Sequence, residues 1–129
     1  MKLSILNHNY TIIRFDPSSA IPGWVKPRQG ELLSITYTSD ELSIVCVEEL
    51  LPASCPEPVE RDWKAIKVEG PLDFSLTGIL YRLAKPLAEQ KISIFAVSTF
   101  DTDYLLVKAD QLAEATEALT REGHIIVQS

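Results

Sequence analysis

The 129-residue sequence predicts an α+β protein whose second half has the element order strand, helix, strand, strand, helix, strand. Two periodicities support this fold class. Apolar residues alternate with period two through the first 50 residues, and from residue 76 onward they recur at helical spacing. Three prolines between residues 52 and 58 separate the two patterns, because proline fits neither a helix interior nor a central strand. We therefore expect two domains, residues 1–60 and 61–129.

The first half is expected to contain two hairpins. Leu3–Leu6 and Tyr10–Phe15 are short apolar runs joined by Asn7–Asn9, whose side chains suit a tight turn. A second antiparallel pair is predicted at Leu32–Thr38 and Leu42–Val47. Between the hairpins, residues 16–30 contain too many prolines and glycines for a regular helix.

The second half begins with a strand predicted at Trp63–Val68, and a helix follows it. Asp73 or Ser75 is a suitable N-cap, and Pro86 is expected to kink or divide the helix. The helix is indicated by apolar residues on one stripe, namely Leu76, Ile79, Leu80, Leu83, Leu87 and Ala88.

Two more strands, a helix and a closing strand complete the second half. The apolar run Ile92–Val97 predicts a strand buried on both faces, and Tyr104–Lys108 predicts its neighbour. Asp110 is expected to cap a second helix that Gly123 ends, and Ile125–Val127 closes the fold. This order, βαββαβ over about 65 residues, is that of a ferredoxin-like domain.

The charge and hydropathy of the chain exclude several classes of partner. Twelve Lys and Arg against 18 Asp and Glu give a net charge of −6, with no basic run to hold a phosphate backbone, so nucleic acid is not expected. No apolar stretch is long enough to cross a membrane, and the N-terminus lacks the apolar core of a signal peptide. We expect a cytoplasmic protein without a membrane partner.

No catalytic or metal-binding motif is present in the sequence. His8 and His124 lie far apart without a carboxylate at ligand spacing, which favours solvated or loosely packed histidines. Cys46, on a predicted strand, is expected to be structural, and Cys55 lies in the proline-rich segment. We expect no enzyme, cofactor or metal; an enzyme that uses either cysteine stays the alternative.

Two polar segments are candidates for a binding site. Residues 70–78 lead into a helix whose first N–H groups would suit a carboxylate, and residues 98–103 contain Asp101 and Asp103. The simpler alternatives are that Asp73 and Ser75 only cap the helix, and that residues 98–103 form a solvated turn. In a ferredoxin-like domain these two segments come close together, so they could hold the carboxylate and the ammonium of a free amino acid.

Residues 76–80, LTGIL, followed by LAKPLAEQKISIF, resemble the Gly-x-Leu helix opening and following strand of ACT domains. The longer run of residues 68–108, VEGPLDFSLTGILYRLAKPLAEQKISIFAVSTFDTDYLLVK, is similar to small bacterial tandem ACT proteins and to the ACT domains of CASTOR-type arginine sensors. Residues 24–48, WVKPRQGELLSITYTSDELSIVCVE, resemble a degenerate ACT-like first half of the same small proteins. The loop before the helix reads Asp-Phe-Ser-Leu-Thr-Gly where ACT domains commonly read Asp-x-Pro-Gly.

The resemblance implies a regulatory protein without catalysis that binds an amino acid or similar small molecule between ACT units, often in a homodimer. The positions it makes candidates for ligand contact are Ser75, Thr77, Gly78, Ser98, Thr99, Phe100, Asp101, Thr102 and Asp103. We expect the helix start to take the α-carboxylate and Asp101 or Asp103 to take a cationic group. The alternative is a protein interaction module that assembles through its sheet edges without a ligand.

Overall fold

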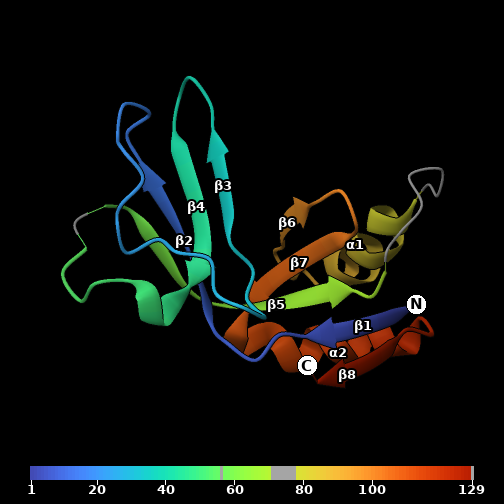
Figure 1. Ribbon diagram of the computed structural model, residues 1–129. Coiled ribbons are helices and arrows are strands. Elements are labelled where there is room, and N and C mark those ends of the chain that lie inside the picture. Colours follow the sequence, from blue (N-terminus) through green and yellow to red (C-terminus); the bar gives the residue numbers. More distant parts are fainter. Residues whose placement is uncertain (56, 71–77, 129) are drawn as a thin grey trace. The chain divides into compact units, whose positions relative to one another are not determined.

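The structure is a computed structural model that describes residues 1–55, 57–70 and 78–128 (Figure 1). It divides into two compact units, residues 8–63 and residues 1–7 together with 64–129. The predicted boundary lies between residues 60 and 61, with residues 1–7 in the first half. The difference arises because the N-terminal strand pairs within the second unit, as described below.

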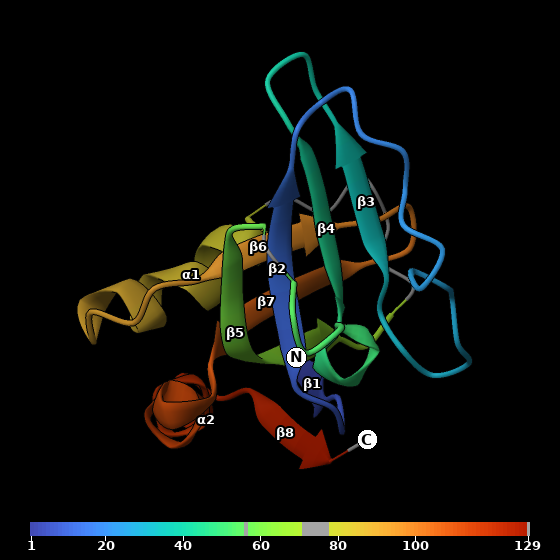
Figure 2. The ribbon, with the colours of Figure 1, turned by 90° about the vertical axis from the view of Figure 1, so that its left-hand side faces the viewer.

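The unit of residues 8–63 is an antiparallel sheet with the strand order β3–β4–β2–β5 (Figure 2). The predicted hairpin is confirmed, because Ser34 to Tyr37 pair with Val45 to Leu42. A short 3₁₀-helix, η1 (Glu48–Leu50), follows β4. The strands are β2 (Tyr10–Phe15), β3 (Ser34–Tyr37), β4 (Leu42–Val47) and the first part of β5 (Val59–Val68).

Alternate residues of β2 and β4 build the core of this unit, as period-two patterning dictates. The buried cluster consists of Ile13, Phe15, Val25, Leu42, Ile44 and Cys46. Because β4 is the one described strand that pairs with β3, β3 is an edge strand of the described sheet. Its residues Ile35 and Tyr37 are exposed.

The second unit has the predicted order of strands and helices, and its α+β ferredoxin-like architecture is confirmed. Its strands lie in the order β6–β7–β5–β1–β8. Besides the end of β5, its elements are β1 (Lys2–Ile5), α1 (Ile79–Glu89), β6 (Phe95–Ser98), β7 (Asp103–Lys108), η2 (Ala109–Gln111), α2 (Leu112–Arg121) and β8 (Ile125–Gln128).

The predicted pairing of Leu3–Leu6 with Tyr10–Phe15 is wrong. Strand β1 pairs antiparallel with β5, where Leu3 opposes Val68, and parallel with β8, where Leu3 opposes Ile126. The physical reason lies in β2, which already bonds β4 along one edge and β5 along the other and so has no free edge for β1. β1 occupies the position between the first and fourth strands of the ferredoxin-like order.

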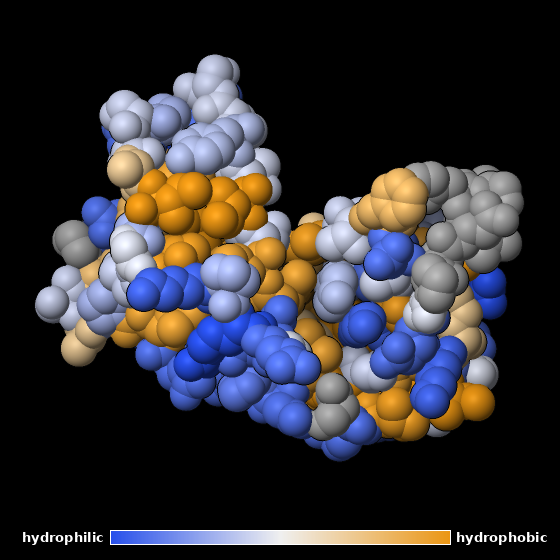
Figure 3. All heavy atoms as spheres, in the orientation of Figure 1, coloured by the Kyte–Doolittle hydropathy of each residue, from blue (hydrophilic) through white to orange (hydrophobic). Residues whose placement is uncertain are grey.

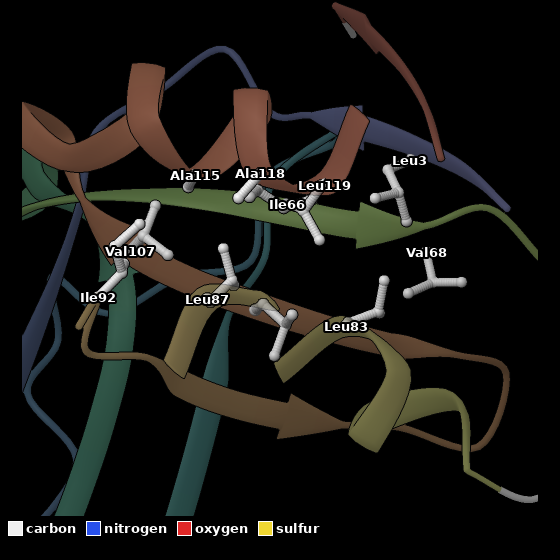
Figure 4. Close-up of a cluster of buried hydrophobic side chains, with 11 residues drawn as sticks. Leu3, Ile66, Val68, Leu83, Leu87, Ile92, Val107, Ala115, Ala118 and Leu119 are labelled. Carbon is white, nitrogen blue, oxygen red and sulfur yellow. The ribbon is translucent and has the colours of Figure 1, made fainter. Parts of the chain in front are cut away.

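Both helices pack their apolar stripes toward the strands of the second unit (Figure 4). On α1 the buried side chains are Leu83, Pro86 and Leu87, with Ile79 partly buried. The expectation that Leu80 is also a core residue is wrong, because its side chain is 37% exposed. The buried stripe contains residues 79, 83, 86 and 87. Leu80 follows residue 79 in the chain, so its side chain projects to one side of this stripe.

Other details of the second unit differ from the prediction. The helix continues through Pro86 and is not divided. Strand β6 begins only at Phe95 and pairs with β7 alone, so its residues are half-buried or exposed rather than buried on both faces. Asp110 lies in η2, and Gln111 is the N-cap of α2 without a side-chain bond. The helix end at Gly123, with φ of 93°, is confirmed.

Candidate functional site

The turn between β6 and β7 holds most of the candidate residues, and its shape is set by two threonines. The Thr99 amide donates to the Thr102 carbonyl at 2.8 Å, and the Thr99 hydroxyl donates to the same carbonyl at 3.1 Å. In return, the Thr102 amide donates to the Thr99 hydroxyl at 3.3 Å. The predicted polar turn is therefore closed by its own hydrogen bonds and does not depend on a ligand for its shape.

Thr102 also fastens this turn to the end of β5. Its hydroxyl donates to the Val68 carbonyl at 2.6 Å, and its side chain is buried. The next residue, Glu69, is held as well, since its amide donates to the Lys2 carbonyl at 3.0 Å and its carboxylate accepts from the Ser4 hydroxyl. The β6–β7 turn is thus fixed beside the end of β5, the strand that precedes α1 in the chain.

The acidic groups of the turn face different surroundings. Asp101 is exposed at the tip, and Asp103 is half-buried at the start of β7, where it pairs with Ser98. Phe100, which precedes Asp101 in the turn, is 80% exposed. Two carboxylates and an aromatic ring at one turn provide partners for a cationic group, through charge and through the face of the ring.

The start of α1 contributes backbone N–H groups. Gly78 is the N-cap in the left-handed conformation, with φ of 75°, and the Arg82 amide donates to its carbonyl at 2.9 Å. Among the described residues no side chain caps this helix. Figure 4 shows α1 beginning at the end of the unit where β5 finishes. The N–H groups of a first helical turn and the helix dipole favour an anion such as a carboxylate at this position.

The sequence-derived candidates are thus brought together in part. Ser98, Thr99, Phe100, Asp101, Thr102 and Asp103 lie on one turn, and Gly78 lies at the start of α1, the element that precedes β6 in the chain. Ser75 and Thr77, together with the expected cap Asp73, lie outside the described residues. Thr102 has a positioning role that the sequence did not reveal, because its partner, the Val68 carbonyl, is 34 residues away.

The unit of residues 8–63 contains a cluster of charged residues that the sequence did not indicate. His8 Nε2 lies 3.6 Å from the Glu31 carboxylate, and His8 Nδ1 lies 4.0 Å from the carboxylate of Glu49. Arg28 donates to both glutamates, reaching Glu31 at 2.6 and 2.8 Å. These bonds from Arg28 hold the pKa of Glu49 below its usual range.

One histidine nitrogen and two carboxylates within 4.8 Å of one another have the chemistry of a divalent-metal site. Arg28 already donates to both carboxylates, so the group is held together as an ion-pair cluster. Its function here is to join the chain after β1, the segment before β3, and η1. Sequence spacing could not reveal it, because the four residues are spread from position 8 to 49.

The remaining histidine and the cysteines have defined environments. His124 is buried, its Nδ1 lies 3.1 Å from the N-terminal amine of Met1, and burial is the main reason its pKa is lowered. Cys46 is buried on β4, as expected, and burial raises the pKa of its thiol to about 11. A thiol with this pKa is a poor nucleophile at neutral pH. Cys55 is half-buried in the proline-rich segment.

Among the helices that the structure describes, none is long and apolar enough to span a bilayer.

Comparison with known proteins identifies sequence families for both units. The family described as ACT domain matches residues 58–121, and a family described as an N-terminal domain matches residues 8–54. The cytosolic arginine sensor for mTORC1 subunit 1 of Bos taurus is 28% identical over 147 residues, 97% of this chain and 44% of the sensor. The chain therefore spans less than half the length of that relative.

Solved structures resemble the whole chain. Protein Atu0741 from Agobacterium tumefaciens is 41% identical, with a TM-score of 0.90 over 99% of this chain and 92% of that one. Aspartate kinase from Clostridium acetobutylicum superposes with a TM-score of 0.65 at 11% identity, over 90% of this chain and 33% of that one. The second likeness shows that the fold is shared.

Proposed function

Because this chain belongs to the ACT-domain family, we propose that it is a regulatory protein that binds a free amino acid. The observation that carries the proposal is the family match over residues 58–121, combined with the fixed turn of residues 98–103 in the matched unit. The bovine relative, named as an arginine sensor, supports a regulatory rather than a catalytic role. The name of the sensor also supports a cytoplasmic location.

The ligand's two charged groups are assigned to the two parts of the site. The N–H groups at the start of α1 take the α-carboxylate, and Asp101 or Asp103 takes a cationic side chain or the α-ammonium. Ser75 and Thr77 belong to the same proposal, next to Gly78. Two acids on one turn favour a basic amino acid such as arginine or lysine.

Binding is tested by thermal unfolding in the presence of each of the twenty amino acids at millimolar concentration. A ligand at about 100 times its dissociation constant adds about 2.7 kcal/mol to the free energy of unfolding, a shift of several degrees. A rise of the midpoint with one amino acid, or with a chemically related few, is the expected result. A flat panel would refute the proposed amino-acid binding at these concentrations.

The site is tested with charge-removing variants of the turn. Asp103→Asn and Asp101→Asn are compared with Asp110→Asn, which removes a carboxylate that is exposed in η2, outside the turn. We expect calorimetric titration to show weaker binding of the stabilising amino acid for at least one turn variant and unchanged binding for Asp110→Asn. Equal affinities in all four proteins would place the ligand elsewhere.

A second candidate function is assembly through a sheet edge, which the exposure of β3 favours. Ile35 and Tyr37 on this edge strand are 38% and 54% exposed, and Figure 3 shows hydrophobic side chains gathered over β3 and β4. A homodimer, which we propose for either function, is measured by light scattering over a range of concentrations. Assembly that is lost in Ile35→Lys and is indifferent to every amino acid would favour this second function.

A further inference from the structure

The unit of residues 8–63 contains a pocket that is separate from the turn of residues 98–103. It has a volume of about 310 Å³ and lies between the chain that follows β2 and the proline-rich segment that precedes β5. Its apolar walls are formed by Phe15, Pro22, Trp24 and Pro52. Pockets that hold small molecules begin at about this size, and they are typically lined by apolar and aromatic side chains with a few polar groups.

The charge on the described lining of this pocket is negative. Glu57 is the only charged side chain among the described residues that line it, and no lysine, arginine or histidine is among them. The Cys55 thiol lies 3.5 Å from Oε1 of Glu57, within reach of a weak hydrogen bond. A thiol is a poor donor, so a positively charged group that approached Glu57 would be a stronger partner than the one it has.

From this combination we propose that the pocket binds a small organic cation, a primary or quaternary ammonium compound. The carboxylate of Glu57 provides the counter-charge, and Trp24 and Phe15 provide aromatic surface of the kind that attracts cations. An anion would find a carboxylate and no basic side chain among the lining residues, and the net charge of −6 disfavours it further. The residues that line this pocket are not among those of the amino-acid site proposed above.

The proposal is tested with choline and with 3,3-dimethylbutan-1-ol, which has the same shape but replaces the charged nitrogen with carbon. Binding is followed by the rate at which iodoacetamide alkylates Cys55, measured by mass spectrometry of the Cys55 peptide. Cys46 serves as an internal control, because it is 1% exposed and the pKa of its thiol is raised to about 11. We expect choline to slow alkylation of Cys55 in a saturable way and the neutral alcohol to slow it much less.

Two variants separate the pocket from general charge effects. Glu57→Gln is expected to weaken choline binding about fivefold, the effect of removing one partly exposed ion pair of about 1 kcal/mol. Glu41→Gln, a half-buried glutamate at the β3–β4 turn outside the pocket, is expected to leave it unchanged. Trp24→Leu tests the aromatic wall through the same readout, with circular dichroism confirming that each variant is folded.

Three results would overturn the proposal. The first is equal protection of Cys55 by choline and by its neutral analogue. The second is the absence of protection by choline at concentrations up to about 50 mM, which would detect even a weak site. The third is equal choline affinity in Glu57→Gln and in the wild-type protein. None of these outcomes bears on the amino-acid panel, so this proposal and the proposed function can fail independently.

Discussion

Replacing Thr102 with valine tests whether the β6–β7 turn is held by its bond to β5. Valine keeps the shape and volume of the side chain but removes the hydroxyl that donates to the Val68 carbonyl at 2.6 Å. Thr102 is 5% exposed, so water cannot readily take over the bond. Loss of a donor from a buried carbonyl costs about 1 to 3 kcal/mol. For a chain of this size, this corresponds to a fall in Tm of about 4 °C for each kcal/mol.

The assay is urea unfolding followed by circular dichroism, with Thr116→Val as the matched control. The Thr116 hydroxyl donates to the Ala113 carbonyl at 3.0 Å on the solvent side of α2, so the same chemical change there should cost less than about 0.5 kcal/mol. Thr102→Ser, which keeps the hydroxyl, should recover part of the loss. Equal effects of the two valine substitutions would refute the argument that burial makes the Thr102 bond important.

Four further outcomes follow from the structure. Leu83→Ala should lower the free energy of unfolding by about 2 to 5 kcal/mol because Leu83 is fully buried, whereas Leu80→Ala, on the exposed side of α1, should cost much less; equal costs in urea unfolding would contradict the observed helix face. Gly78→Ala should cost about 1 to 2 kcal/mol through its positive φ alone, since an added Cβ meets no atom within 4 Å, whereas Gly23→Ala, without a positive φ, should be close to neutral. His124 has a folded-state pKa below its unfolded value of about 6.5, so the unfolded chain binds more protons and stability should fall as pH drops below about 7; His124→Gln should flatten this part of the stability curve. Arg28→Met should destabilise the unit of residues 8–63 by leaving Glu31, whose side chain is 8% exposed, without its main positive partner, and simultaneous Glu31→Gln should recover part of the loss in a double-mutant cycle.

The local parts of the fold were predictable because their causes are local. The hairpin of β3 and β4 follows from alternation around a short polar turn, and the end of α2 follows from a glycine at the C′ position. The partner of β1 was not predictable in this way, because Leu3 pairs with Val68 and Ile126, far along the chain. The residues of a short apolar strand do not specify which strand it will pair with, and nearness in sequence suggested β2 as the partner of β1.

Which residues of α1 and β6 are buried was predictable only in part, because burial depends on packing against distant parts of the chain. Apolar residues at helical spacing indicated α1, but six apolar positions fit one stripe loosely, and only packing decides that Leu83 and Leu87 face the strands while Leu80 does not. The apolar run before β6 suggested burial on both faces. Composition does not show that β6 lies at the edge of the unit with β7 as its one partner.

The geometry of the candidate turn divides five of its six residues, all but Ser98, into two kinds, a distinction that sequence polarity does not make. Thr99 and Thr102 use their hydroxyls within the turn and on the Val68 carbonyl, so their expected role is to position the turn. Asp101 and Asp103 are the groups that we propose to contact a ligand by charge, and Phe100, which is 80% exposed, offers aromatic surface beside them. If this division is correct, Thr102→Val weakens amino-acid binding by loosening the turn, with a matching loss of stability. Asp103→Asn instead weakens binding while the free energy of unfolding stays nearly constant, and measuring both quantities on both variants distinguishes the two roles.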